Sequence, residues 1–279
     1  MFRSKTCMYC PVECVVEVAE QAFKECTQLM EIIFNEGLKK IGAKAFSGCS
    51  LLEVVTFPSS VIGINCKAFY NCRNLKELVL NTGLKRIGSC AFHNCHSLKS
   101  IVFPSSLTRI GRQSFENCSN LKEVVLNIGL REMGDSAFGR CSSLQTAALP
   151  STLTKFESNA FYNCSNLTKV VLNEGMTKIC PYMFEGCMSI SSISLPSTTK
   201  VVCEHAFDGC TNLSKVLLND GQQKIESCAF QDRKSLRSIK IPTTVFEIGG
   251  DAFNRCARLR EVILYDTMQN KLHSLNADQ

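Results

Sequence analysis

The residues best suited to chemistry in this sequence are its cysteines and histidines. Cys7, Cys10 and Cys14 form a close cluster with the spacing C-x-x-C-x-x-x-C, which is one ligand short of a structural zinc site. No fourth ligand stands near them, because Cys26 belongs to a repeated position described below. We therefore expect residues 1–14 to be a cysteine-rich N-terminal cap or the remnant of a leader, with a metal site as the disfavoured alternative.

A second candidate is the group His93, Cys95 and His96, which looks like the thiol and imidazole of a nucleophilic catalyst. Neighbours in sequence do not make a catalytic dyad, and other repeats place Tyr70 or Glu116 at the position of His93. The chain also lacks a glycine-rich phosphate loop, an H-E-x-x-H motif and a nucleophile elbow. We expect no enzymatic activity, no catalytic residues, no cofactor and no small-molecule substrate.

These residues lie in a chain that repeats itself every 23 residues. A phenylalanine marks each of the eleven copies, and no insertion or deletion separates them. They are Phe23, Phe46, Phe69, Phe92, Phe115, Phe138, Phe161, Phe184, Phe207, Phe230 and Phe253. A fixed period of this length is typical of a solenoid, in which each coil buries its apolar face against its neighbours. We expect one solenoid domain over residues 15–264, followed by a polar tail at 265–279.

Each repeat carries a strand pattern after its phenylalanine. Leu167, Val170 and Leu172 follow Phe161 with the spacing L-x-x-L-x-L, whose inward side chains line a short strand. A later apolar pair, three residues apart, predicts a second short strand or an extended segment. The A-F-x-x-C stretch suits a single helical or 3₁₀ turn. The expected fold is a β-rich α/β repeat solenoid of about eleven 23-residue coils, with a parallel strand face and brief helical turns.

The full pattern A-F-x-x-C-x-x-L-x-x-I-x-L-P-x-x-L-x-x-I-G resembles the BspA-type, or surface-antigen type, leucine-rich repeat. The resemblance covers about nine-tenths of the chain, and the period together with the A-F and C-x-x-L landmarks is specific. It implies a leucine-rich repeat rod without shared catalytic residues. Several members of that family are cell-surface proteins implicated in adhesion or protein binding, so the resemblance implies a role of that kind.

A second period runs inside the first, because the residue twelve positions after each phenylalanine alternates between asparagine and proline. The residues are Asn35, Pro58, Asn81, Pro104, Asn127, Pro150, Asn173, Pro196, Asn219 and Pro242. The genetic unit is therefore a pair of coils, 46 residues long. Proline ends a strand without donating a ladder hydrogen bond, and asparagine closes the turn with its side chain. We expect the two solutions to be structurally interchangeable.

Ten of the eighteen cysteines share one repeat position, three residues after the phenylalanine. A position stacked on its own copies favours a small apolar side chain, and free cysteine is among the most buried residue types. We expect a column of reduced packing residues, with disulfides between stacked coils as the alternative. Arg233 stands where an eleventh cysteine is due. Because an unpaired guanidinium is costly to bury, we expect an exposed bend there, beside Asp232 and Lys234.

Composition narrows the class of protein. The net charge of +6 is mild, whereas dedicated nucleic-acid binders concentrate basic charge, so we do not expect a nucleic-acid partner. No stretch approaches the ~18 apolar residues of a membrane span. The first residues lack the apolar run of a signal peptide, which favours a cytoplasmic protein with reduced cysteines. A secreted or cell-surface protein is the alternative.

The outward positions of the predicted strands carry the information about function. Asparagine-type coils place a charged residue eight positions after the phenylalanine and an apolar residue ten positions after it. The candidate partner-binding residues are Glu77, Val79, Glu123, Val125, Lys169, Val171, Lys215 and Leu217. They form either a solvated sheet face or a docking surface, and an exposed apolar strip favours docking. We predict a non-catalytic scaffold that binds a protein partner of unknown identity through this face, with an adhesin or surface antigen as the alternative.

Overall fold

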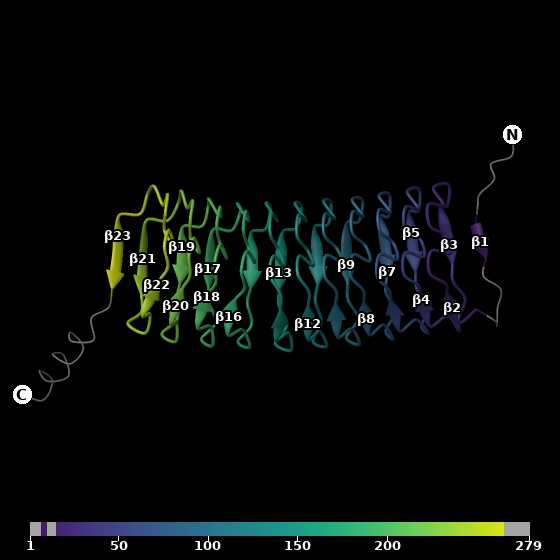
Figure 1. Ribbon diagram of the computed structural model, residues 1–279, viewed down its shortest axis with the longest axis horizontal. Coiled ribbons are helices and arrows are strands. Elements are labelled where there is room, and N and C mark those ends of the chain that lie inside the picture. The colour runs from purple at the N-terminus through teal and green to yellow at the C-terminus, as the bar shows by residue number, and fades with distance from the viewer. Residues whose placement is uncertain (1–6, 10–14, 265–279) are drawn as a thin grey trace, which may run out of the picture.

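The computed structural model describes residues 7–9 and 15–264, and there the chain winds into a solenoid of short parallel strands (Figure 1). Each full coil holds one longer and one shorter strand. The longer strands are β1 (Cys7–Tyr9), β3 (Glu31–Ile33), β5 (Val54–Thr56), β7 (Glu77–Val79), β9 (Ser100–Val102), β11 (Glu123–Val125), β13 (Thr146–Ala148), β15 (Lys169–Val171), β17 (Ser192–Ser194), β19 (Lys215–Leu217), β21 (Ser238–Ile241) and β23 (Glu261–Leu264). The shorter strands are β2 (Glu17–Val18), β4 (Lys40–Ile41), β6 (Gly63–Ile64), β8 (Arg86–Ile87), β10 (Arg109–Ile110), β12 (Glu132–Met133), β14 (Lys155–Phe156), β16 (Lys178–Ile179), β18 (Val201–Val202), β20 (Lys224–Ile225) and β22 (Glu247–Ile248).

The two sets of strands form two sides of the rod. The longer strands pair with one another, as do the shorter ones, always in parallel and at equivalent positions of neighbouring coils. In Figure 1 the longer strands lie along the upper part of the rod and the shorter ones along the lower part. We call the solvent side of the longer strands from β3 to β23 the strand face, and that of the shorter strands the back face. The predicted parallel repeat solenoid is confirmed.

The core is a continuous stack of phenylalanine rings. Ring centroids of neighbouring coils lie 5.2–5.8 Å apart and the ring planes stay within 15° of one another. All the rings from Phe46 to Phe230 are completely buried. Successive side chains of a strand point to opposite sides. In a strand such as β11 the middle residue therefore packs into this core, and its two neighbours point to solvent. The repeat period therefore fixes both the core and the outward positions.

The A-F-x-x-C stretches form hydrogen-bonded turns, and the described residues contain no helix. Residues two before and two after each phenylalanine adopt a left-handed backbone conformation, as Lys67 (φ 56°) and Asn71 (φ 60°) do around Phe69. Left-handed residues occur singly and interrupt a right-handed helix. The Phe69 amide instead donates to the Ala91 carbonyl of the next coil at 2.7 Å. The brief helical turns expected from the sequence are thus replaced by turns that bond from coil to coil.

The asparagine-type and proline-type coils are not interchangeable, so that expectation is wrong. Asn173 Nδ2 donates to the carbonyl oxygens of Pro150 (2.9 Å) and Leu153 (3.3 Å) in the preceding coil, and Oδ1 accepts from the Gly175 amide at 2.7 Å. Asn219 makes the same contacts with the preceding proline-type coil. Asn81, Asn127, Asn173 and Asn219 therefore bond to the coil before them, whereas Asn35 Nδ2 has no hydrogen-bond partner among the described residues. Beyond β7 the strand-face ladders join each proline-type coil to the coil that follows it, as β9–β11, β13–β15, β17–β19 and β21–β23.

Arg233 is completely buried, which corrects the exposed bend expected from the sequence. The flanking Asp232 keeps the coil in register, since its amide donates to the Asn254 carbonyl at 3.0 Å. The side chain at position 233 consequently points into the core, whichever residue type stands there. The guanidinium lies over the Phe230 ring, 4.4 Å from its centroid, and none of its three nitrogens has a hydrogen-bond partner within the described residues. Burial lowers the pKa of Arg233 to about 10.

Candidate protein-binding face

The eight candidate residues lie on four strands of the strand face. Each of β7, β11, β15 and β19 turns its middle residue inward and exposes the residues on either side. The charged members are therefore exposed to solvent. The apolar members keep a large accessible fraction, which is 41% for Val79, 37% for Val125, 48% for Val171 and 49% for Leu217. The structure thus exposes all eight residues, while their contact with a partner stays a prediction.

The apolar members belong to a longer exposed column. Ile33 on β3 and Val102 on β9 occupy the equivalent position in other coils and are also exposed. Val102 and Val125 are register partners on the paired strands β9 and β11, and Val79 occupies the same position one coil earlier, on β7. Thr56, Ser194 and Lys240 interrupt the column, and Ala148 is its smallest apolar member. An exposed apolar strip such as the one from Val79 to Val171 is a feature of interaction surfaces rather than of ordinary solvated faces.

Shallow grooves cross the strand face, and two of them lie where a ladder is broken. A groove of about 460 Å³ lies between β7 and β9, and one of about 410 Å³ lies between β19 and β21. Neither pair of strands is joined in one sheet, because the ladders close within the asparagine–proline pairs and open between them. A third groove, of about 390 Å³, lies between the paired strands β3 and β5. The grooves give an otherwise flat face the relief that a side chain of a partner needs.

The charged column changes sign along the rod. Glu77 and Glu123 lie toward the N-terminal end, whereas Lys169 and Lys215 lie toward the C-terminal end. None of the four forms an ion pair with another described residue. Unpaired surface charges of opposite sign at the two ends of a strip fix the orientation of a partner more than they add to its affinity.

The cysteines of the column are packing residues with their own hydrogen bonds. Every thiol of the column except that of the exposed Cys26 donates to the carbonyl oxygen of the phenylalanine in the preceding coil, as Cys141 Sγ does with Phe115 O at 3.2 Å. Burial raises the pKa of Cys118 and of Cys164 to about 12, so these thiols stay protonated and unreactive. All fifteen cysteines among residues 15–264 are free. The bond to the phenylalanine carbonyl connects neighbouring coils, and no residue pattern predicts it.

We expect a reducing agent to leave the melting temperature unchanged, because the column contains no disulfide. Cys141→Ser should fold, since its hydroxyl can donate to the Phe115 carbonyl. Cys141→Ala should cost about 1–2 kcal/mol through the lost bond and packing. The exposed Cys66 provides the control, because Cys66→Ala removes no buried group. Thermal melts with and without dithiothreitol test this, and a large drop in melting temperature on reduction would establish disulfides instead.

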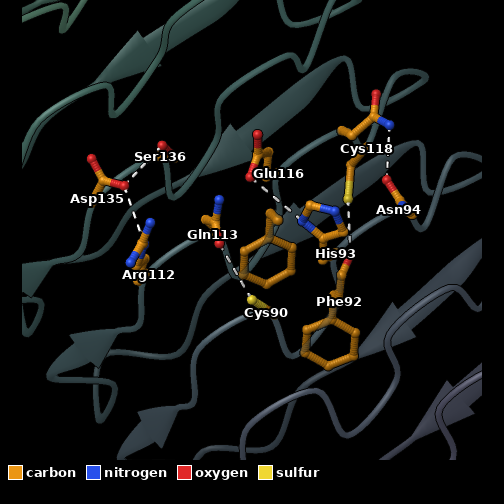
Figure 2. Close-up of polar contacts among 12 residues, drawn as sticks. Cys90, Phe92, His93, Asn94, Arg112, Gln113, Glu116, Cys118, Asp135 and Ser136 are labelled. Carbon is orange, nitrogen blue, oxygen red and sulfur yellow. Dashed lines mark hydrogen bonds and ion pairs between the residues drawn. The ribbon is translucent and has the colours of Figure 1, made fainter.

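The residues His93, Cys95 and His96 do not form a catalytic pair. Cys95 lies in the buried column, with Sγ 3.4 Å from the Phe69 carbonyl oxygen. The His93 ring instead stacks on Tyr70, with centroids 5.1 Å apart, and its Nδ1 lies 3.5 Å from Glu116 Oε2. Figure 2 shows His93 turned toward Glu116. A separate hydrogen bond runs from the Cys90 thiol to the Gln113 side chain.

Sequence reasoning missed a buried polar cluster in the A-F-x-x-C turns. Glu116 is almost fully buried and accepts a hydrogen bond from the hydroxyl of Tyr162, two coils away. The tyrosine reaches that far because Gly139 stands between them, and a Cβ at Gly139 would overlap the Tyr162 ring. Arg140 lies 5.4 Å from the centroid of the same ring. The available signal was the shared repeat position of His93, Glu116, Gly139 and Tyr162, directly after the phenylalanine.

We expect His93 to make the fold less stable in acid. Burial lowers the pKa of His93 below 6.5, although Glu116 opposes the shift, and His96 and Lys67 add to it. The unfolded chain therefore takes up a proton near pH 6.5 that the folded chain does not, so the free energy of unfolding falls as the pH falls through this value. The slope is at most about 1.4 kcal/mol per pH unit.

The variant His93→Tyr tests this, because Tyr70 occupies the same position one coil earlier. Urea denaturation at about pH 7 and pH 5 should show a smaller pH dependence in this variant than in the parent protein. His96→Gln is the control and should keep most of the parental dependence, because His96 contributes less to the pKa shift of His93 than burial does. A parent protein that gains stability in acid would mean that the ion pair with Glu116 outweighs the burial of the imidazole.

Within residues 15–264 no group of three or more histidine, cysteine, aspartate or glutamate side chains is placed to hold a metal ion. The side chains of Cys7, Cys10 and Cys14, the sequence's one candidate cluster, lie outside the described residues. The part of the chain that the structure describes has no helix of the length and apolarity needed to cross a bilayer.

Parallel short strands, one buried phenylalanine per coil and the L-x-x-L-x-L strand pattern define a leucine-rich repeat solenoid. The family model for the BspA type leucine rich repeat region matches residues 9–95, 85–213 and 177–275. These matches span most of the sequence, so the chain belongs to the BspA-type leucine-rich repeat family.

Solved structures agree with this assignment. The fold is similar to that of a leucine-rich repeat protein from Bacteroides ovatus, which is 26% identical over 89% of this chain and 82% of the other, with a TM-score of 0.62. It is also similar to a leucine rich cell surface protein from Faecalibacterium prausnitzii (20% identity, 93% and 89% coverage, TM-score 0.60). A third similar structure is the pneumococcal vaccine antigen PcpA (19% identity, 81% and 67% coverage, TM-score 0.57). The comparison with curated proteins gave no match.

Proposed function

We propose that this protein is a non-catalytic scaffold that binds a partner protein through the strand face. The observation that supports this most is the exposed apolar column beside charged residues that recur on every second strand of the same face. The parallel ladders and the stacked phenylalanines hold both columns rigidly, so little conformational entropy is lost on binding. Val79, Val125, Val171 and Leu217 supply buried contact area, and the charged neighbours orient the partner.

The variant Lys169→Glu/Lys215→Glu should bind the partner at least about tenfold more weakly, because both charges at the basic end of the strip are reversed. Both side chains are exposed, so the fold should be unchanged. The matched control is Lys178→Glu/Lys200→Glu, which makes the same change of net charge at exposed positions beside the back-face strands. Partners captured by the parent protein are titrated against all three proteins. Equal affinity for the parent and the strand-face variant would move the site off this face.

The proposal includes the cellular compartment, which we take to be the cytoplasm. The free cysteines of the described residues support the reducing cytoplasm. A cell-surface adhesin or antigen is the second candidate, and the description of the Faecalibacterium prausnitzii relative as a cell surface protein favours it. Fractionation of cells that produce a tagged full-length chain separates the two. Protease-accessible tag on intact cells would support the surface protein, and tag recovered only after lysis would support the cytoplasmic scaffold.

A further inference from the structure

Basic side chains gather at the C-terminal end of the strand face without acidic partners. Lys215 lies on β19, Lys240 on β21, and Arg237 and Arg260 directly precede β21 and β23. All four are exposed, and none forms an ion pair with another described residue. We call these four residues the basic cluster.

Many charges of the rod meet an opposite charge at the equivalent position of a neighbouring coil, as Lys76 does with Glu53 at 2.7 Å and Lys224 with Glu247 at 3.0 Å. In the basic cluster Arg260 and Arg237 occupy equivalent positions and carry like charges, with a backbone hydrogen bond of 2.8 Å between them. Lys122 and Lys99 repeat this arrangement in the middle of the rod, but only the arginine pair lies next to two further basic residues, Lys215 and Lys240, that line a groove. Like charges directly opposite on paired strands are destabilising. An anionic ligand would remove this repulsion.

The groove between β19 and β21 lies inside the basic cluster. Its lining includes the basic Lys215 and Lys240, the hydroxyl of Ser238 and the half-exposed apolar Leu217. Lys215 and Leu217 are two residues apart on one strand, so their side chains project in parallel, ~6.7 Å from each other. An extended polypeptide has the same spacing between alternate side chains. A carboxylate and an apolar side chain at positions i and i+2 of a partner would match this pair.

We propose that the basic cluster and its groove bind an extended, acidic segment of a partner protein in which carboxylates alternate with apolar side chains. The proposal rests on the proposed function and specifies the chemistry of the partner at one end of the strand face. A polypeptide fits better than a polyanion, because Asp220 lines the same groove and the exposed Glu261 lies on β23. A polyanion carries negative charge at every residue and would meet both carboxylates. A peptide can present apolar or neutral groups to them.

The test uses the full-length protein and a fluorescent peptide of alternating aspartate and leucine, with binding measured by anisotropy. We expect saturable binding that weakens as salt is added. Arg237→Glu/Lys240→Glu should weaken it at least about tenfold. The control Lys99→Glu/Lys122→Glu reverses two exposed lysines that occupy equivalent positions of neighbouring coils but do not line the groove between β19 and β21, and should change affinity less than about twofold. Melting temperatures confirm that the variants fold.

Three outcomes would overturn the proposal. They are absence of binding by the acidic peptide, equal weakening in the two double variants, and tighter binding of a heparin oligosaccharide or a single-stranded oligonucleotide than of the peptide. Leu217→Ser adds a further test, since it should weaken the peptide complex but not a polyanion complex. The site residues Arg237 and Lys240 are absent from the test of the proposed function. The two ideas can therefore fail separately, because partner binding can depend on Lys169 and Lys215 while the acidic peptide does not bind.

Discussion

Replacing Phe138 with alanine should lower the free energy of unfolding by about 3–5 kcal/mol, as expected for a buried aromatic ring. Phe138 is completely buried in the middle of the array. Its ring stacks on Phe115 at 5.4 Å and on Phe161 at 5.8 Å, and meets the edge of Phe103 at 6.2 Å. The substitution removes contacts on both sides of one coil. The missing ring leaves a cavity in that coil. Because each coil is stabilised only by its neighbours, this cavity interrupts the contact between the coils before it and the coils after it.

The matched control is Phe253→Ala, at the last ring of the column. Phe253 is only partly buried and stacks on a single ring, Phe230, at 5.3 Å. Its loss should therefore cost clearly less than the loss of Phe138. Urea denaturation followed by circular dichroism measures both variants against the parent protein. Small and equal losses at the two sites would show that the rings do not act as one continuous core.

The repeat made the core and the strands predictable from sequence. An aromatic residue at a fixed interval must stack on its copies, and residues on either side of a buried strand position must point outward. That reasoning placed Val79 and Lys169 on the surface, where the structure has them. It needed only the period and the two-residue alternation of a strand. Contact between these residues and a partner remains a prediction. The sequence pattern shows that the residues are exposed, but it does not show which molecule binds them.

Features that depend on contacts between coils were not predictable in the same way. The turn around Phe69 looked helical because its local sequence allows a helical turn, whereas Lys67 has no special preference for the left-handed conformation that it adopts. The Asn173 side chain looked like a local turn former, although two of its bonds go to the preceding coil. The Glu116–Tyr162 contact spans two coils and depends on the missing side chain of Gly139. Positions considered one coil at a time do not reveal such contacts.

Arg233 is the clearest case in which the repeat overrides the preference of a residue. Local sequence favours exposure, but the coil turns position 233 inward, where ten other coils place a cysteine. The Phe207–Phe230 and Phe230–Phe253 spacings of 5.6 and 5.3 Å fall within the range of the other coils, so the stack does not widen around the larger side chain. The cost of the residue is therefore electrostatic rather than a loss of stacking.

Arg233→Cys should consequently raise the free energy of unfolding by about 1–4 kcal/mol, which is the gain seen when buried ionic groups are replaced by apolar ones. The stack on Phe230 offsets part of the burial cost, by about 2 kcal/mol for a desolvated cation over a ring. The position accepts a thiol readily, since Cys210 donates to the Phe184 carbonyl at 3.1 Å one coil earlier and Cys256 repeats this arrangement one coil later.

Arg233→Met separates charge from volume, because it removes the cation and keeps most of the bulk. If burial of the charge sets the cost, urea denaturation should show that Arg233→Met and Arg233→Cys are both more stable than the parent protein. The reciprocal change Cys141→Arg introduces an unpaired cation in the middle of the column, where Cys141 is completely buried, and should be strongly destabilising. Loss of stability in both Arg233 variants would show instead that the contact between the guanidinium and Phe230 outweighs the desolvation of the charge. The column would then tolerate a cation because its aromatic neighbours bind one.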